Sequence, residues 1–183
     1  MLPHQRPAVV DDVPRLRALM QEAIRAHFPA FHDARQTESA SRHIGEPDIT
    51  LIEDGTFYVF EEGDELVACG GWSRRDKLFT GAGAAAGDAR LLDPATEPAR
   101  VRAMFVRHDW ARRGIGRAIL TACEDAARAE GFTTLALMAT LPGEQLYRAY
   151  GFVETDRTMI TMPDGVQLDG VAMERPIAPA PRA

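Results

Sequence analysis

The hydrophobic pattern changes from strand-like to helical near the N-terminus. Residues 8–10 form a short apolar run, and apolar residues then recur at helical spacing as far as His27. Asp12 is a suitable N-cap, and Pro14 falls in the first turn of this repeat. The pattern predicts a strand at 8–10 followed by an amphipathic helix.

Two strand-like runs follow a polar region. Residues 34–44 are polar and only weakly helical, which predicts a surface segment. Residues 57–60 are rich in β-favouring side chains, 61–65 form a turn, and 66–72 are apolar again. This order predicts a β-hairpin.

The second half of the chain alternates between the two periodicities. A long loop of small residues at 78–98 precedes it. The pattern then predicts a strand, a helix, a strand, a short helix and a closing hairpin, at 99–106, 115–129, 133–139, 143–150 and 153–175, with a Pro-Asp-Gly turn at 163–165. Strands and helices that alternate in this way indicate an α/β layer.

Length and charge narrow the class of protein. The chain has 183 residues and a net charge of −6, which predicts one domain and argues against nucleic acid or an anionic membrane as a partner. We expect the domain to span 1–177 and to be followed by a flexible tail at 178–183. The 21 basic residues include a single lysine, Lys77, so a lysine-based phosphate loop is excluded.

The two cysteines, Cys69 and Cys123, are far apart and suggest neither a disulfide framework nor a metal site. No apolar run of 18 residues is present, and prolines and acids interrupt the N-terminus where a signal peptide would be apolar. We therefore expect a protein of the reducing cytoplasm, without a bound metal.

The segment 106–120 carries the strongest chemical signal. A predicted strand ends, and a turn rich in arginine and glycine then opens the next helix. Unpaired N–H groups and the positive end of the helix dipole favour an anion there, such as a phosphate or pyrophosphate. The residues concerned are Arg112, Arg113, Gly114, Gly116 and Arg117. A tight turn with solvated arginines is the alternative interpretation.

This turn is not a dinucleotide-binding fingerprint, because Ile119 occupies the position of its third glycine. A second segment, 146–152, follows the strand at 133–139. Tyr147 and Tyr150 lie three residues apart on a short helix and share a face, so they can line a crevice. Core packing of the two rings is the alternative.

Taken in order, these segments resemble the GNAT-type N-acetyltransferase superfamily. The resemblance rests on the strand at 99–106, the Arg-Gly-Ile-Gly turn at 113–116, the break at Gly131, the strand at 133–139 and the Leu-Tyr-x-x-x-Gly-Phe sequence at 146–152. It covers about residues 99–155. It implies a three-layer α/β (α+β) fold, in which a mixed and mostly antiparallel sheet is flanked by helices.

The resemblance also implies the roles of individual residues. The strand before the turn would bind the pantetheine arm of acetyl-CoA through its backbone, and the turn would wrap the pyrophosphate. Tyr147 would protonate the departing thiolate. The implied cofactor-binding residues are Met104, Phe105, Val106, Arg112, Arg113, Gly114, Ile115, Gly116, Arg117, Ala118 and Thr140.

The sequence departs from the family pattern at three positions. Ala111 replaces a usual Arg or Gln, and Thr140 stands where an Asn is common. The strand at 99–106 carries arginines and no acid, so the base that some members have there is missing. Glu97, His108 or a water molecule would have to accept the proton.

The resemblance implies an enzyme that moves acetyl from acetyl-CoA to a small primary amine or an exposed amino group, and a homodimer is possible. Two alternatives remain open: a non-catalytic acyl-CoA-binding or sensory module, and an unrelated nucleotide-binding domain. The acidic clusters favour a cationic acceptor, although they are equally typical of a solvated surface. Cys123 lies on the apolar face of its helix, which indicates a buried, inert thiol.

Overall fold

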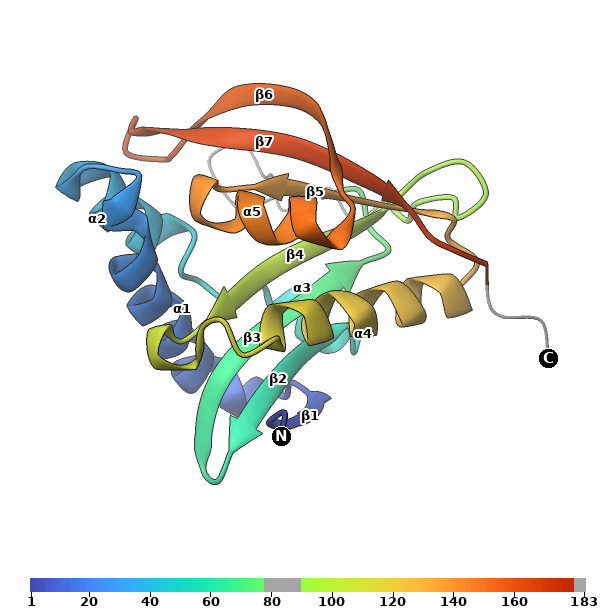
Figure 1. The fold of residues 1–183 in the computed structure, drawn as a ribbon, viewed down its shortest axis with the longest axis horizontal. Helices are drawn as coiled ribbons and strands as arrows, with labels where there is room; N and C mark the ends of the chain where they lie inside the picture. The colour runs from blue at the N-terminus through green and yellow to red at the C-terminus, as the bar shows by residue number, and fades with distance from the viewer. Residues whose placement is uncertain (78–89, 180–183) are drawn as a thin grey trace.

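A computed structural model describes residues 1–77 and 90–179, and in these residues a seven-stranded sheet lies between two layers of helices (Figure 1). The strand order is β1-β2-β3-β4-β5-β7-β6, and β4 and β5 are the parallel pair. The predicted three-layer, mostly antiparallel fold is confirmed. The strands are β1 (His4–Pro7), β2 (Phe57–Glu62), β3 (Glu65–Ser73), β4 (Ala99–Val106), β5 (Thr134–Ala139), β6 (Val153–Thr161) and β7 (Gln167–Pro176).

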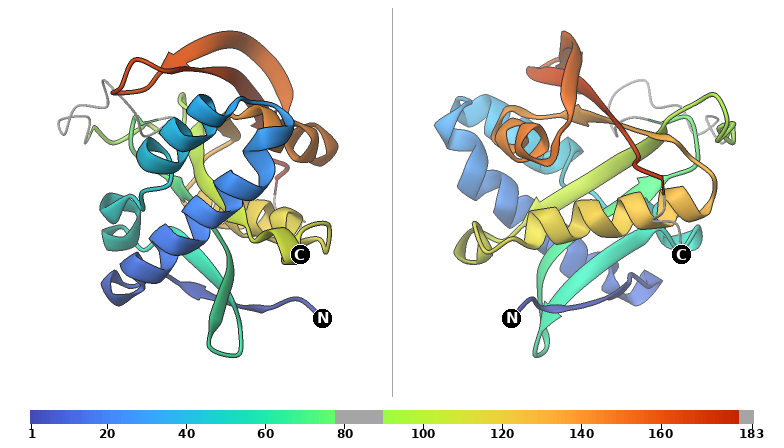
Figure 2. Two further views of the ribbon diagram at one scale, coloured as in Figure 1. Left: turned by 90° about the vertical axis from the view of Figure 1, so that its left-hand side faces the viewer. Right: turned by 45° about the vertical axis from the view of Figure 1, so that its right-hand side comes forward.

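The helices cover both faces of the sheet (Figures 1 and 2). One face carries α1 (Val13–His27), α2 (Ala34–His43) and α3 (Ile49–Glu53), and the other carries α4 (Ile115–Ala129) and α5 (Leu141–Tyr150). Side chains of β2 point alternately to the two faces of the sheet and pack against the helices there. Phe57 and Val59 pack with α1 and α3, whereas Phe60 packs with α4. The sheet is therefore apolar on both sides.

The predicted strand at 8–10 is wrong by about four residues. The pairing with β2 runs from His4 to Pro7, and Val10–Asp12 form a turn of 3-10 helix instead. Asp12 determines this turn, because its carboxylate accepts from the Val9 N–H at 2.9 Å and pairs with Arg6 at 2.7 Å. The same contacts explain why Asp12 does not cap α1 through its side chain.

The segment at 34–44 is more regular than its polarity predicts. It forms the helix α2, whose N-terminus is closed by a capping box in which Asp33 and Gln36 bond to each other's backbone. Its inner face buries Thr37, Ser39 and Ser41. The helix is thus part of the structural core rather than a surface segment.

Two predicted segments fall partly outside the described residues. Of the predicted loop at 78–98, residues 78–89 are not described, and of the predicted tail at 178–183, residues 180–183 are not described. In the described residues, no helix is long and apolar enough to cross a membrane.

The parallel strands β4 and β5 separate soon after they begin. They pair only at Ala99 with Leu135 and at Arg100 with Ala136. Beyond these pairs β5 remains bonded along its whole length to β7 on its other side. The gap between the C-terminal ends of β4 and β5 is therefore open in the middle of the sheet.

A buried ion pair ties α3 to β4. The Arg102 guanidinium donates to Asp48 at 2.7 Å, and both side chains are less than a tenth exposed. Asp48 also caps α3 by accepting from the Thr50 N–H at 3.0 Å, and Lys77 lies 3.2 Å from it. Burial alone would raise the pKa of Asp48, but Arg102 and Lys77 hold it below its ordinary value.

The variant Asp48→Asn should destabilise the protein by about 3 kcal/mol, because it leaves Arg102 buried without its counter-charge. The stabilisation from a carboxylate with a lowered pKa is full above the unfolded value of about 3.9 and is lost as the pH falls through the folded value. Wild-type stability should therefore fall below about pH 4 more steeply than that of the variant. Urea unfolding at pH 7, 5 and 3 measures both effects.

The control for this experiment is Asp11→Asn, which removes an exposed carboxylate of the same size. We expect it to change the free energy of unfolding by less than about 0.5 kcal/mol. Equal losses in the two variants would mean that the Asp48 pair does not stabilise the fold.

Candidate active site

A cleft of about 530 Å³ opens where β4 and β5 separate. The residues around it come from the end of α1, the second half of β4, the turn before α4 and the first turns of α5 (Figure 1). They are Ala23, His27, Phe28, Met104, Phe105, Val106, Trp110, Ala111, Arg112, Gly114, Ile115, Gly116, Arg117, Thr140, Pro142, Gly143, Gln145, Leu146, Tyr147 and Ala149.

The cleft contains most of the residues that the sequence predicts to bind a cofactor. Nine of those eleven line it, together with Tyr147. Arg113 and Ala118 do not belong to its lining. Residues of three separate predicted segments therefore meet at one site.

The edge of β4 presents backbone groups to the gap. The N–H of Arg107 donates to Val67 of β3 at 2.9 Å. Because successive residues of a strand point their backbone groups to opposite sides, those of Val106 and Met104 face away from β3. A bulge precedes them, where Ala103 has a φ of +55° and the β3–β4 register shifts. In the described chain, the Val106 carbonyl lies 3.2 Å from the Nε2 atom of His27, and the other backbone groups of Met104 and Val106 are left to pair with an extended ligand.

The turn before α4 presents a row of free backbone N–H groups. Arg112 has a φ of +65° and Gly114 a φ of +84°. In the described chain, none of the six N–H groups from Arg112 to Arg117 donates to another residue, whereas those of Ala111 and Ala118 on either side do. Left-handed residues in such a turn and a helix N-terminus both form anion-binding concavities. The geometry suits a pyrophosphate.

The arginines of this turn differ in their surroundings. Arg113 lies over the Trp110 ring at 4.5 Å and donates to the Asp109 carbonyl, and Arg117 lies over the Tyr150 ring at 5.3 Å. Arg112 makes no ion pair with another described residue and lines the cleft. Arg112 is thus the most available charge for an anionic ligand.

The Tyr147 ring lies inside the cleft and is held in place by packing. A Cβ at Gly143 would meet its Cε2 atom at 2.8 Å, and the Phe152 ring packs edge-on against it at 5.9 Å. Its hydroxyl bonds to no other described residue. Burial raises the pKa of Tyr147 well above its ordinary value, so the phenol keeps its proton at neutral pH.

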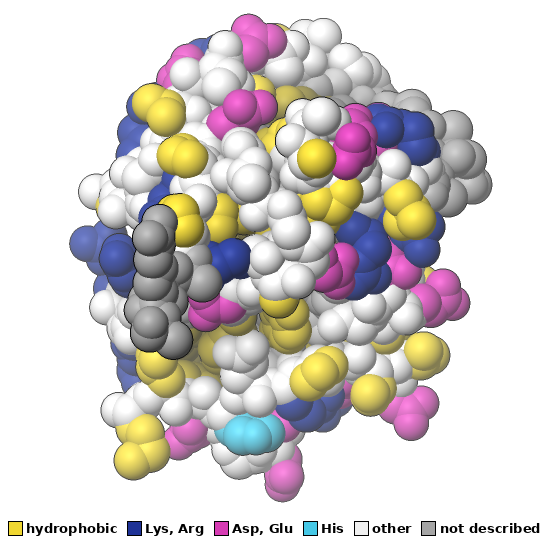
Figure 3. All heavy atoms as spheres, turned by 90° about the vertical axis from the view of Figure 1, so that its right-hand side faces the viewer, with side chains coloured by type: hydrophobic (Ala, Val, Ile, Leu, Met, Phe, Trp, Pro, Cys, Tyr) yellow, Lys and Arg dark blue, Asp and Glu magenta, His cyan; other side chains and the backbone are white. Residues whose placement is uncertain are grey.

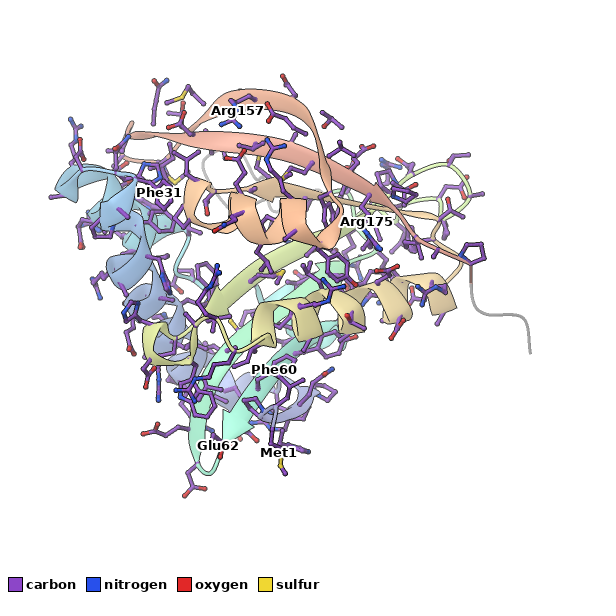
Figure 4. All side chains as sticks on the ribbon, in the orientation of Figure 1. Met1, Phe31, Phe60, Glu62, Arg157 and Arg175 are labelled. Atoms are coloured by element: carbon purple, nitrogen blue, oxygen red, sulfur yellow. The ribbon has the colours of Figure 1, made fainter. Side chains whose placement is uncertain are left out.

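Tyr150 has a different role from Tyr147. Its hydroxyl donates to the buried Glu124 at 2.7 Å, and Arg175 contacts the same carboxylate at 2.5 Å. Figure 4 shows Arg175 where β7 passes between α5 and α4. The Tyr150 hydroxyl is thus committed to a structural network and lies outside the cleft.

The two residues that the sequence suggests as a general base, Glu97 and His108, lie in different parts of the structure. Glu97 precedes β4 at the end away from the cleft, where Arg90 lies 2.7 Å from it. The hydrogen bonds from Arg90 and from the Asp93 N–H lower the pKa of Glu97 to about 2. The hypothesis of Glu97 as a base is therefore wrong. His108 is exposed, and its ring lies 5.4 Å from the ring of His27.

Other lining residues are less clearly marked in the sequence. His27 and Phe28 fall in a region that shapes the acceptor site in the similar family, but inward packing of its aromatic rings is an equally good interpretation. His27 lies at the end of α1 with its Nε2 atom 3.2 Å from the Val106 carbonyl, and Phe28 follows it. On α5, Pro142, Gly143 and Leu146 face the cleft. Their spacing on one helix face indicates a buried surface but not a ligand, so only the splayed strands reveal their role.

Both cysteines are fully buried. Burial raises the pKa of Cys69 to about 12 and that of Cys123 further. Neither thiol is therefore a nucleophile at neutral pH. No cluster of potential metal ligands is present among the described residues, so the chemistry of the cleft rests on backbone groups, arginines, histidines and Tyr147.

Fold and cleft together define an α+β protein with an open cleft between two parallel strands and a row of free N–H groups beside it. Residues 16–152 match the acetyltransferase (GNAT) family. The chain belongs to this family of N-acetyltransferase enzymes, which use acetyl-CoA.

Solved structures of the same fold cover nearly the whole chain. A GCN5-related N-acetyltransferase from Rhodopseudomonas palustris has a TM-score of 0.73 at 17% identity, with 96% of each chain covered. The PaiA N-acetyltransferase from Thermoplasma acidophilum, solved in complex with coenzyme A, has a TM-score of 0.65 at 13% identity. The match covers 96% of this chain and 99% of that one. The ribosomal-protein-S18-alanine N-acetyltransferase from Escherichia coli has a TM-score of 0.58 at 19% identity, with 98% of this chain and 97% of that one covered. No curated protein matches the chain significantly.

Proposed function

We propose that this protein transfers acetyl from acetyl-CoA directly to a primary amine in the cleft between β4 and β5. The observation that carries the proposal is the row of six free N–H groups from Arg112 to Arg117, which lies beside the unpaired edge of β4. The turn would bind the pyrophosphate, and the backbone of Met104 and Val106 would pair with the pantetheine arm. The thioester then lies near Tyr147.

The chemistry requires few groups. The amine nitrogen attacks the thioester carbonyl carbon, and a backbone N–H at 104–106 stabilises the oxyanion of the tetrahedral intermediate. The carbonyl double bond then re-forms from the oxyanion as the C–S bond breaks. Tyr147 gives its proton to the leaving thiolate, which yields free CoA and the acetylated amine. The high pKa of Tyr147 keeps this proton available before the transfer.

The attacking amine must also lose a proton. Glu97 is too far from the cleft, but His27 lines it, and the exposed ring of His108 lies beside His27. We propose that the proton leaves through water to this pair of histidines. Because Cys123 and Cys69 are buried, neither thiol is placed to accept the acetyl group.

A non-catalytic acyl-CoA-binding module would use the same turn and strand. The position of Tyr147 favours catalysis, because its unbonded hydroxyl lies in the cleft rather than in the core. Release of CoA in the presence of amines distinguishes the two functions, since a binding module would bind acetyl-CoA without turnover.

Gly114→Val should lower the affinity for acetyl-CoA at least tenfold. Gly114 needs its φ of +84°, and a side chain there would project into open space at the cleft where the anion binds. Titration calorimetry with acetyl-CoA measures the loss. The matched control is Gly165→Val, since Gly165 has a φ of +81° and open space around it in the β6–β7 turn.

Both variants should lose stability, because a left-handed backbone costs an L-residue about 1–2 kcal/mol. Only Gly114→Val should lose affinity. If both variants bind acetyl-CoA like the wild type, the turn does not hold the pyrophosphate.

Tyr147→Phe should lower kcat by about a hundredfold or more and leave the affinity for acetyl-CoA nearly unchanged, because it removes only the proton donor. Tyr150→Phe is the matched control on the same helix. It removes a hydroxyl that bonds Glu124, so it should cost about 1–3 kcal/mol of stability without a comparable fall in kcat. Stopped-time assays of thiol release give kcat. Wild-type turnover in Tyr147→Phe would remove Tyr147 from the mechanism.

A further inference from the structure

A second, smaller cavity adjoins the inner end of the cleft. It measures about 90 Å³ and shares Met104, Thr140 and Tyr147 with the cleft. Part of its lining belongs to the core cluster between α1, α2 and the β6–β7 hairpin. Its wall is mostly apolar, with Ile44, Met138, Ile160 and Met162 among its residues.

Among the residues that the structure describes, Arg102 is the only charged one in the lining of this cavity. Its side chain is 4% exposed, and only its Nη1 atom bonds to a described residue, which is Asp48. A guanidinium has five N–H donors, and buried donors are normally satisfied. The Nε and Nη2 groups of Arg102 donate to none of the described residues, and Arg102 lines the cavity, so these donors are available to a ligand there.

The ion pair does not neutralise this cation. Asp48 is shared between Arg102 at 2.7 Å and Lys77 at 3.2 Å, and its other oxygen accepts from the Thr50 N–H. Two positive charges thus face one negative charge. The local charge favours an anionic oxygen in the cavity, and a guanidinium binds a carboxylate with two parallel hydrogen bonds.

The position of Arg102 relates this site to the reaction. Arg102 lies two residues before Met104 on β4, with the bulge at Ala103 between them, and both residues line the small cavity. In the proposed function, the acetyl group lies near Met104 and Tyr147. A small acceptor whose anionic group contacts Arg102 would extend its amine along β4 toward the thioester.

The surface charge gives little support to a cationic acceptor. Arginines pair with several of the acids in the acidic clusters, namely Asp12, Glu61, Glu65 and Glu97. On the face shown in Figure 3, acidic and basic side chains are interspersed. Arg102 carries the charge in the lining of the small cavity, whereas Arg112 and Arg117 line the cleft at the turn before α4.

We propose that Arg102 selects the acceptor by binding its carboxylate, so that the substrate is an amino acid or another small amine with an anionic group. This inference rests on the proposed acetyl transfer. It names the class of acceptor and the residue that recognises it.

The test compares each acceptor with its uncharged amide. Glycine, alanine, phenylalanine and glutamate are assayed against their α-amides and against simple diamines, with acetyl-CoA and detection of the released thiol. We expect the best amino acid to exceed its amide at least tenfold in kcat/KM. Arg102→Gln should remove this preference, mainly through KM, and leave the affinity for acetyl-CoA unchanged.

Arg100→Gln is the matched control, because Arg100 lies on the same strand but pairs with Asp76 and does not line the cavity. It should retain the preference for the acid. Arg102→Lys keeps the charge and should retain part of the preference. If Arg102→Gln fails to fold, the wild-type ratio of acid to amide decides the question alone, and a ratio near one overturns the proposal.

A binding measurement separates this inference from the proposed function. Calorimetry with CoA and an N-acetylated amino acid, or its amide, tests recognition of the carboxylate without turnover. Tighter binding of the acid without CoA release from any amine would overturn acetyl transfer but support the carboxylate site. Turnover of amides and diamines as fast as of acids would support acetyl transfer and overturn the role of Arg102.

Discussion

The site depends on the early separation of β4 and β5. Two pairs of residues join these strands at one end, and beyond that point pairing with β7 keeps β5 in the sheet. A sheet that opens in its middle leaves main-chain donors and acceptors without partners, which is costly unless water or a ligand satisfies them. The cleft is therefore a gap in the hydrogen bonding of the sheet, and its extended shape matches a ligand that takes the place of a strand.

Interactions on both faces of the sheet stabilise the open arrangement. On one face, Arg102 and Asp48 link β4 to α3, and the bulge at Ala103 turns the following residues toward the gap. On the other face, the Glu124 carboxylate accepts hydrogen bonds from Tyr150 of α5 and Arg175 of β7. This network fixes the C-terminal end of α5, while the first turns of the helix line the cleft. The reacting groups thus lie on elements that are anchored elsewhere.

The sequence predicts the central elements well because their signals are local. The bounds of β4 and α4 follow from apolar periodicity and from Gly114, which begins the helix with a positive φ. The early strand was misplaced because the contacts of Asp12 with Arg6 and Val9 outweigh the apolar run beside it. Glu97 looked like a base only because its pairing with Arg90 is not visible in the sequence. Arg102 and Asp48 are 54 residues apart, so no local pattern reveals the charge in the small cavity.

The ion pair of Lys77 with Asp48 affects how readily a thioester can acetylate this chain. Thioesters acetylate exposed lysines, and a protein that binds one at its surface is the nearest target. This chain has 21 basic residues of which one is a lysine, and its ammonium is held against Asp48 at 3.2 Å. Guanidinium groups stay protonated and do not attack thioesters. The choice of arginine for nearly every positive charge therefore leaves few amines on this chain for a thioester to acetylate.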